Sequence, residues 1–324
     1  MAVQSLSPEG RQTTLAFIGC GMYLSYSSRA SAPQMNHKQP VYKFYNLLTE
    51  NKGNMGSAIL NGLLDATRTK TGKIHHFIIS TKTAASAERL RTQYAEDASR
   101  VTIAHDSNLR AMREADIILL ACKPFLAKGI LAAPGVGEAL SGKLVISIMA
   151  GMTPTDILDC LSDGDRKSVK IVRAMPNVAA RLRQSMTIVE LPETRPLEEE
   201  LVEVVTWVFE VIGKVKFLTA DLFDAGTMLV GAGIGVMTVP LEGLLDGCVV
   251  EGLRRAEALE MAAQMLSGMA ALLREGSHPA VLRENISSPR GCTIQGVMTV
   301  ERAGARATFA DAVINGTKHL KGDR

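Results

Sequence analysis

The feature that most constrains the fold of this chain is a glycine-rich turn whose two halves are separated by residues 22–53. The first half, T-L-A-F-I-G-C-G at 14–21, is typical of a short buried strand that runs into a Gly-x-Gly turn. The second half, N-M-G-S-A-I-L at 54–60, supplies a third glycine and the start of an apolar-faced helix. Joined directly, the halves form a strand, Gly-x-Gly-x-x-Gly and a helix. Such a turn brings backbone N–H groups and a helix N-terminus against the pyrophosphate of a dinucleotide.

The segment 22–53 differs from the rest of the chain. It contains four of the five tyrosines, and its apolar residues follow no sustained helical or strand period. Connections within a βα unit usually contain about 2–6 residues. The residue pairs at 21–22 and 52–53 are compatible with codons that carry the GT and AG splice signals. We therefore predict that 22–53 is a translated, unspliced intron. The alternative is a genuine surface loop, particular to one lineage or disordered.

Length, composition and charge limit the classes of protein to consider. A chain of 324 residues is long enough for two domains, and 46% hydrophobic with 21% charged residues is typical of a globular protein. A net charge of +3 gives no reason to expect nucleic acid or a membrane surface as partner. No apolar run approaches the ~18 residues that indicate a transmembrane helix, and the first residues show no signal-peptide pattern.

Cysteines and histidines show no pattern of a bound metal or a disulfide framework. The five cysteines are scattered, without a C-x-x-C pair, and the six histidines lack ligand spacing. We expect no metal site. Free thiols favour a reducing compartment, and we expect a cytoplasmic protein.

Strand-like and helix-like segments alternate up to residue 219. The predicted strands are 14–18, 75–80, 101–103, 115–121, 143–148, 169–173, 185–190 and 213–218, and the predicted helices are 55–66, 84–95, 107–114, 154–161 and 197–211. This alternation indicates an α/β, Rossmann-type doubly wound sheet with helices on both faces. We assign residues 1–219 to an NAD(P)-binding domain.

From residue 220 onward the chain predicts helices alone. Ala-, Leu-, Met- and Gly-rich stretches cover roughly 222–253, 255–275, 278–285, 292–303 and 307–319. A domain of about 100 residues cannot cover so much apolar surface by itself. We therefore predict that 220–324 is an all-α substrate-binding and dimerisation domain in a homodimer or a larger homo-oligomer.

Several motifs together resemble those of the pyrroline-5-carboxylate reductase family. They are the split F-I-G-C-G/N-M-G-S-A-I, A-C-K-P at 121–124, S-I-M-A-G-M-T at 147–153, V-R-A-M-P-N at 172–177 and H-P-A-V-L-R-E-N-I-S-S-P-R-G-C-T-I-Q at 278–295. The last motif is the most specific, and the resemblance covers nearly the whole chain outside 22–53. It implies reduction of the cyclic imine 1-pyrroline-5-carboxylate to L-proline with NADPH or NADH, the last step of proline biosynthesis.

The resemblance also implies positions for the cofactor. The pyrophosphate loop corresponds to Gly19, Cys20, Gly21, Asn54, Met55 and Gly56. Other cofactor contacts correspond to Asn108, Ala121, Cys122, Lys123, Pro124, Met149, Ala150, Gly151 and Asn285. At the end of the second strand, where a ribose 2′ group should lie, the chain has Ser80, Thr81 and Lys82. An NAD-preferring site usually has Asp or Glu there, so hydroxyls and a lysine favour the 2′-phosphate of NADPH.

For the substrate, the resemblance points to the loop at 288–293. Its backbone N–H groups at a helix start can hold a carboxylate. The implied substrate contacts are Ser288, Gly291, Cys292 and Thr293, and Thr293 is the candidate catalytic residue, hydrogen bonded to the imine nitrogen. Arg290 stands where the family usually has glycine, and Cys292 where it usually has alanine.

Two other interpretations stay open at this point. One is a catalytically impaired product that oligomerises while its nucleotide loop is broken by 22–53. The other is a relative with a different substrate, such as a β-hydroxyacid dehydrogenase, although the loop S-S-P-R-G-C-T does not fit that class.

Overall fold

The computed structural model describes residues 14–18, 55–68, 74–162, 166, 168–191 and 196–322. The segment 22–53 and four of the predicted cofactor residues, Gly19, Cys20, Gly21 and Asn54, lie outside this part of the chain. The chain divides into two compact units, Met1–Gly226 and Thr227–Arg324.

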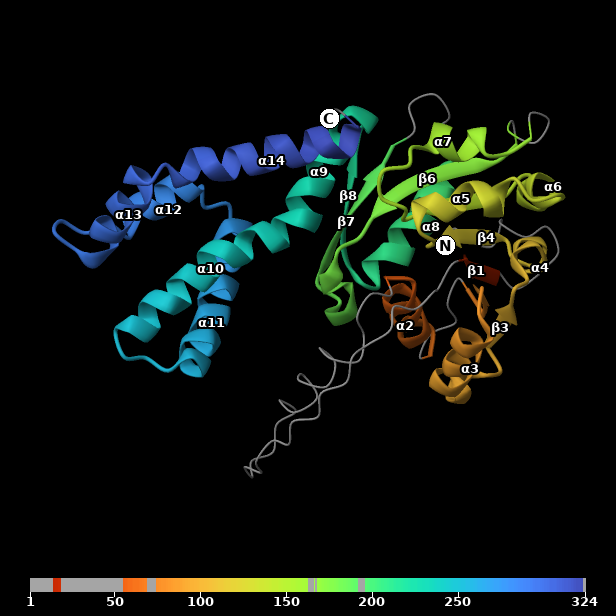
Figure 1. Ribbon diagram of the computed structural model, residues 1–324, viewed down its shortest axis with the longest axis horizontal. Coiled ribbons are helices and arrows are strands. Elements are labelled where there is room, and N and C mark those ends of the chain that lie inside the picture. The colour runs from red at the N-terminus through yellow and green to blue at the C-terminus, as the bar shows by residue number, and fades with distance from the viewer. Residues whose placement is uncertain are drawn as a thin grey trace. The chain divides into compact units, whose positions relative to one another are not determined.

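Within the described residues, the first unit is built on an eight-stranded sheet (Figure 1). The strands are β1 (Thr14–Ile18), β2 (His76–Thr81), β3 (Val101–His105), β4 (Ile117–Leu120), β5 (Leu144–Ser147), β6 (Lys170–Met175), β7 (Ser185–Glu190) and β8 (Gly213–Leu218). Their spatial order is β3-β2-β1-β4-β5-β6-β7-β8. The first six pair in parallel, which is the 3-2-1-4-5-6 order of dinucleotide-binding folds. The predicted doubly wound sheet is confirmed.

The last two strands depart from the parallel pattern. β7 runs antiparallel to β6, with Ala174 opposite Val189, and β8 then pairs in parallel with β7. Residues 176–184, which include the 3₁₀ helix η2 (Val178–Leu182), are too few for the crossover helix that a parallel neighbour requires. The chain therefore reverses direction at this edge of the sheet.

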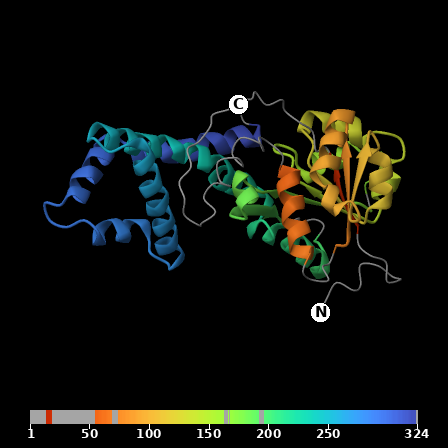
Figure 2. The same cartoon turned by 90° about the horizontal axis from the view of Figure 1, so that it is seen from below.

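Helices cover both faces of the sheet (Figure 2). One face carries α2 (Met55–Arg68), α3 (Ala84–Gln93) and α8 (Glu199–Glu210), and the other carries α4 (Asn108–Glu114), α5 (Pro124–Leu131), α6 (Val136–Leu140) and α7 (Pro154–Asp159). A short 3₁₀ helix, η1 (Ala95–Asp97), follows α3.

Alternating side chains of β1 enter two separate cores. Phe17 packs on the face covered by α2 and α8, and Ile18 packs on the face covered by α4 to α7. Both side chains are fully buried. Burial of such a side chain contributes about 1.5–3 kcal/mol relative to exposure, so β1 is central to the stability of the sheet.

The second unit is helical. Its elements are η3 (Met228–Ala232), a π-helical stretch, followed by α10 (Gly233–Val250), α11 (Arg255–Arg274), α12 (Pro279–Asn285), α13 (Cys292–Arg302) and α14 (Ala305–Lys321). The helix α9 (Ala220–Thr227) precedes η3. No strand follows Leu218 among the described residues, in agreement with the prediction. The units divide after Gly226 rather than after residue 219, because Phe223 and Asp224 of α9 pack against Arg173 of the sheet.

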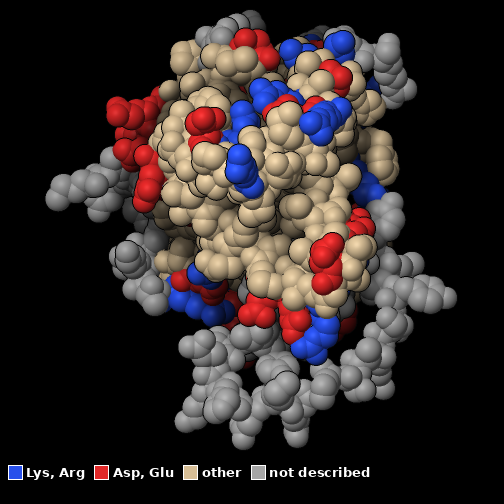
Figure 3. All heavy atoms as spheres, turned by 90° about the vertical axis from the view of Figure 1, so that its left-hand side faces the viewer, with Lys and Arg blue, Asp and Glu red and all other residues tan. Residues whose placement is uncertain are grey.

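Large apolar side chains are exposed on α10 and α11 of a single chain. Figure 3 shows a large uncharged area on the face that carries these helices. Exposed apolar residues include Met237, Val239, Leu244, Val250, Leu259, Met261, Met265, Leu266 and Met269. Many large exposed apolar side chains on two neighbouring helices are typical of an interaction site, as a dimerisation domain requires.

The continuous helix from Ala220 to Val250 is long and apolar enough to cross a membrane by length and composition. Charged residues such as Glu242 and Asp246 interrupt its apolar residues, so the sequence shows no uninterrupted apolar run here. A helix whose exposed side is covered by another subunit has the same composition, so this property alone is weak support for a membrane span.

Candidate active site

The candidate cofactor site begins at the carboxyl ends of the central strands. The strand order changes direction between β1 and β4, and dinucleotides bind outside the strand ends at such a point. Backbone bonds hold these ends together: Ala121 N donates to Ile18 O at 2.9 Å, and Ile148 N donates to Leu120 O at 3.0 Å. Met55 and Gly56 are the first residues of α2, where unpaired N–H groups favour an anion.

At the end of β2, three polar residues differ in their surroundings. Ser80 is fully buried, and its hydroxyl donates to Asn108 Oδ1 at 2.7 Å. Thr81 is also buried, and its hydroxyl donates to Thr83 O at 3.2 Å. The side chain of Lys82 is exposed. Ser80 therefore fixes Asn108 at the start of α4, while Lys82 is the cation that can reach a ligand.

The exposed ammonium of Lys82 is the donor here that suits a phosphate, because the hydroxyl protons of Ser80 and Thr81 are already donated to Asn108 Oδ1 and Thr83 O. β2 carries no carboxylate at its end, where NAD-preferring sites usually place Asp or Glu. An ammonium group pairs with a phosphate as a point charge.

The loops after β4 and β5 touch through two sulfur atoms. Cys122 Sγ donates to Met149 Sδ at 3.3 Å, and both residues are buried. Burial raises the pKa of the Cys122 thiol to about 11, so it stays neutral and acts as packing rather than as a nucleophile.

The neighbouring residues leave space for a ligand. Gly151 has φ +73°, and a side chain at that position would meet no described atom within 4 Å. Lys123 precedes α5, which starts at Pro124, and its ammonium lies 5.9 Å from the Phe125 ring centre. Ala150 and Lys123 are exposed. This edge of the sheet is therefore bordered by small and solvent-facing groups.

In the second unit, the loop 288–291 leads into α13. Gly291 is the N-cap residue and no side chain caps the helix, which leaves the first N–H groups of α13 available. A Cβ at Gly291 would lie 2.4 Å from Ser288 Oγ, which would have to rotate away, and 3.1 Å from Ser288 O, so the turn is close. Arg290 has φ 62°, a left-handed conformation that glycine adopts more readily.

Two predicted substrate residues border a hollow of about 450 Å³ on this unit. Cys292 and Thr293 lie at its edge. The other lining residues come from α12 and α13: Arg283, Gly296, Val297, Val300 and Glu301. Asn285 is exposed at the end of α12 and is not among the lining residues. The hollow is large enough for a small ring compound.

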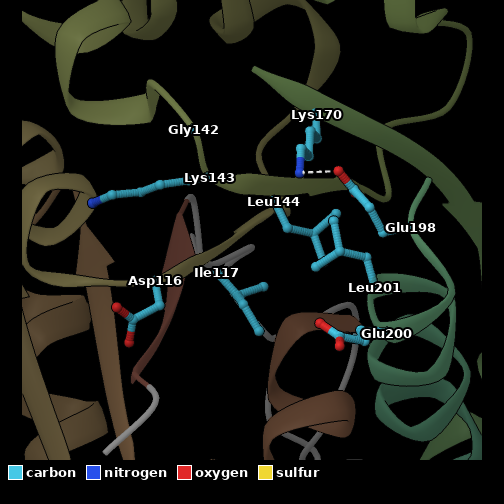
Figure 4. A pocket seen from close by; sticks show the side chains of 9 residues that line it. All are labelled: Asp116, Ile117, Gly142, Lys143, Leu144, Lys170, Glu198, Glu200 and Leu201. Atoms are coloured by element: carbon cyan, nitrogen blue, oxygen red, sulfur yellow. Dashed lines mark hydrogen bonds and ion pairs between the residues drawn. The ribbon is translucent and has the colours of Figure 1, made fainter. Parts of the chain in front are cut away.

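A second hollow, of about 330 Å³, lies at the amino ends of β4, β5 and β6, opposite the candidate cofactor site (Figure 4). Both of its lysines are already engaged in the structure. Lys170 Nζ lies 2.6 Å from Glu198 Oε1, and Lys143 Nζ donates to the carbonyls of Met112 and Arg113 at the end of α4. Burial lowers the pKa of Lys143. These contacts tie α4 and α8 to the strands and are structural.

Sequence reasoning missed a buried charged cluster formed by Arg173, Glu190 and Asp224. Arg173 Nη2 donates to Asp224 Oδ1 at 2.8 Å, and Nη1 lies 3.6 Å from Glu190 Oε2. The guanidinium also lies 4.1 Å from the centre of the Phe223 ring. Burial raises the pKa of Glu190, and the charge of Arg173 opposes this rise. The sequence signal for this cluster is Arg173, a charged residue inside the otherwise apolar strand segment K-I-V-R-A-M.

The described residues contain no group of three or more His, Cys, Asp or Glu side chains arranged to hold a metal ion. Four cysteines in this part of the chain, Cys122, Cys160, Cys248 and Cys292, are free.

Family models match both parts of the chain. A model described as pyrroline-5-carboxylate reductase dimerisation matches residues 220–322. A model described as NADP oxidoreductase coenzyme F420-dependent matches residues 52–151.

Solved structures share the fold. A pyrroline-5-carboxylate reductase of Coxiella burnetii has a TM-score of 0.73 at 22% identity and covers 96% of this chain and 98% of its own. The Plasmodium falciparum pyrroline carboxylate reductase with NADP bound has a TM-score of 0.71 at 22% identity, with the same coverage.

Curated relatives are more similar in sequence. A pyrroline-5-carboxylate reductase of Lophium arboricola is 35% identical over 333 residues, which cover 97% of this chain and 94% of the relative. One of Neurospora crassa is 37% identical over 295 residues, which cover 82% of this chain and 89% of the relative. With this identity over nearly its whole length, the chain belongs to the pyrroline-5-carboxylate reductase family.

Proposed function

We propose that this protein reduces 1-pyrroline-5-carboxylate to L-proline with NADPH. The observation that carries the proposal is the similarity, over nearly the whole chain, to relatives that bear this enzyme's name. The named relatives do not support the alternative of a non-catalytic oligomer. The loop 288–293, which opens α13 without a side-chain cap, also fits a carboxylate-bearing substrate.

The proposed cofactor contacts follow the carboxyl edge of the sheet. The first turn of α2, with Met55 and Gly56, binds the pyrophosphate together with Gly19, Cys20, Gly21 and Asn54. Lys82 pairs with the 2′-phosphate, beside Ser80 and Thr81, and Asn108 is held at the adenosine end by Ser80. The loops 121–124 and 149–151 border the nicotinamide, and Asn285 of the helical domain adds a contact. This arrangement favours NADPH over NADH.

The proposed substrate contacts lie at the start of α13. The backbone N–H groups of Cys292 and Thr293 hold the carboxylate beside Gly291, and Ser288 closes the turn because its carbonyl accepts a hydrogen bond from Gly291 N at 3.0 Å. The Thr293 hydroxyl holds the imine nitrogen by a hydrogen bond. When bound, NADPH would supply a hydride to C5 of the protonated imine, whose proton stays on the nitrogen of the product. The chain contributes position rather than a strong acid. Among the residues that line the hollow, the one carboxylate is that of Glu301, two helical turns from Thr293.

We further propose that residues 22–53 are not part of the functional enzyme. The family match to the nucleotide-binding domain begins at residue 52 and omits β1. Yet β1 pairs with both β2 and β4 in the centre of the same sheet. Residues 22–53 therefore lie, in the sequence, between two parts of one domain and interrupt the pyrophosphate turn. The nucleotide-binding domain then comprises 1–219 without that segment, and 220–324 is the dimerisation domain.

The remaining proposals concern assembly and location. The apolar surface of α10 and α11 is covered in a homodimer or a larger homo-oligomer. The free cysteines favour a reducing compartment, and we place the enzyme in the cytoplasm.

The test is an assay of the full chain and of a variant lacking 22–53, with 1-pyrroline-5-carboxylate and NADPH. We expect the shortened protein to oxidise NADPH and form proline in equal amounts, and the full chain to be much slower. A 3-hydroxy acid with NADP⁺ serves as the control substrate for a β-hydroxyacid dehydrogenase. Turnover of the hydroxy acid without proline formation by either protein would refute the proposal.

A further inference from the structure

Asp106 lies beside the proposed 2′-phosphate site, on the strand next to β2. Thr81 and His105 are paired in register at the ends of β2 and β3. The residues that follow them, Lys82 and Asp106, therefore leave the sheet side by side. Asp106 N donates to Thr81 O at 2.8 Å, and Lys82 Nζ lies 3.9 Å from Asp106 Oδ1.

The backbone fixes the position of this carboxylate. Asp106 has φ 46°, a left-handed conformation that Asp and Asn tolerate better than most residues. The next residue, Ser107, donates its hydroxyl to His105 O at 2.8 Å, and α4 begins at Asn108. Because Asn108 is itself bonded to Ser80, the carboxylate is tied to the same strand ends as the lysine.

The charge of Asp106 is not neutralised by a buried partner. Its side chain is 65% exposed and that of Lys82 is 87% exposed, and an exposed pair of this kind is weak. Among the described residues, Lys82 is the one cation within ion-pair distance of Asp106. A phosphate that binds Lys82 therefore comes within a few ångströms of the exposed Asp106 carboxylate.

We propose that Asp106 is a specificity-determining residue that lowers the preference of this site for NADPH over NADH, because its carboxylate repels the 2′-phosphate held by Lys82. This inference rests on the proposed function, in which Lys82 binds that phosphate. The phosphate carries about −1.5 to −2 charges at pH 7, whereas the 2′-hydroxyl of NADH carries none. Lys82 and Asp106 thus oppose each other, and the preference for NADPH is smaller than Lys82 alone would give.

The experiment measures dissociation constants of NADPH and NADH by titration calorimetry on the full chain and on the protein lacking 22–53. In Asp106→Asn, which retains the shape and tolerates the same backbone, we expect the ratio Kd(NADH)/Kd(NADPH) to rise about three- to tenfold. The rise comes from tighter NADPH binding and shrinks at high salt. An unchanged ratio would overturn the inference.

Two further variants separate direct repulsion from other effects. Glu114→Gln removes the same charge at the far end of α4, and should leave the ratio unchanged; an equal rise there would show a general charge effect and overturn the inference. Asp106→Asn should also raise the ratio in a Lys82→Gln background. If the ratio did not rise in that background, Asp106 would act only through Lys82. Direct repulsion of the phosphate by Asp106 would then be ruled out.

Failure of the proposed function gives a different result. A protein that binds both nucleotides with the expected shift but forms no proline refutes the reductase activity and leaves the role of Asp106 intact. A protein that binds neither nucleotide, with or without 22–53, overturns both.

Discussion

Arg173 on β6 and Asp224 on α9 form a buried ion pair, with Nη2 of the arginine 2.8 Å from Oδ1 of the aspartate. Arg173 is only 4% exposed and also faces Glu190 and the ring of Phe223. The pair fastens the first turns of the long helix 220–250 to the sheet. It therefore decides that α9 belongs to the first unit although the family's dimerisation model begins at residue 220.

Loss of one partner of this pair should destabilise the first unit. Asp224→Asn leaves the buried guanidinium with a single carboxylate, and breaking a buried pair from one side costs about 3–5 kcal/mol. The free energy of unfolding in urea measures the loss. Glu88→Gln, which removes the exposed contact between Glu88 and Arg91, is the control and should cost less than about 1 kcal/mol. Equal effects of the two substitutions would contradict this role of Asp224.

Glu190 should make stability depend on pH in a direction opposite to that of most carboxylates. Burial raises its pKa above the usual 4.5 despite the opposing charge of Arg173. The folded protein therefore binds this proton more tightly than the unfolded chain does. Its contribution to stability is fully present below pH 4.5 and is lost as the pH rises through the raised pKa. Glu190→Gln lacks this loss, so the variant should gain stability relative to the wild type as the pH rises above 4.5. Parallel stability curves for the two proteins would rule this out.

The thiols of Cys122 and Cys292 should differ strongly in reactivity. With a pKa of about 11, roughly one Cys122 in a thousand is a thiolate at pH 8, and the residue is buried. Cys292 is exposed on α13. Iodoacetamide should modify Cys292 in the folded protein and Cys122 only after denaturation, as peptide mass spectrometry will show. Early modification of Cys122 would mean that the loops after β4 and β5 do not pack as described.

Thr293 should affect catalysis rather than folding. Thr293→Val keeps the shape of the side chain but removes the proposed hydrogen bond to the imine nitrogen, and we expect kcat to fall about 10- to 100-fold. Thr299→Val on the same helix is the matched control, because the Thr299 hydroxyl donates to Gln295 O. Steady-state kinetics of both variants lacking 22–53 provide the comparison. Normal kcat in Thr293→Val would remove this residue from the proposed site.

The elements of the sheet were predictable because their apolar runs are continuous. Ile117–Leu120 and Leu144–Ser147 lie within continuous apolar runs, which are typical of a parallel strand buried on both faces. The helices α5 and α6 were missed because they are short and α5 is partly exposed, with Phe125 facing solvent. The antiparallel direction of β7 was missed because it depends on the length of the preceding connection rather than on strand composition.

The side-chain contacts of the candidate site were less predictable. The motif at 121–124 pointed to Cys122, but its contact with Met149 joins residues 27 positions apart. The bond between Ser80 and Asn108 and the proximity of Lys82 to Asp106 likewise depend on the pairing of β2 with β3. Sequence patterns identify strand ends, whereas the register between strands decides which side chains meet.

The segment 22–53 should weaken binding of the cofactor without preventing folding. Loop-closure entropy grows slowly with length, so the sheet tolerates a long insertion, but the pyrophosphate turn requires the strand end at Ile18 and the helix start at Met55 to be joined closely. The protein lacking 22–53 should bind NADPH much more tightly than the full chain, by calorimetry, while their unfolding curves stay similar. Equal affinity would contradict the interpretation of 22–53 as an interruption.

The most direct test of the proposed reaction follows a labelled hydride. The protein lacking 22–53 is supplied with 1-pyrroline-5-carboxylate and NADPH deuterated at the transferred position of the nicotinamide. We predict L-proline that carries one deuterium, located at C5 by mass spectrometry and NMR. Proline without the label, or no proline while the protein still binds NADPH, would contradict the account.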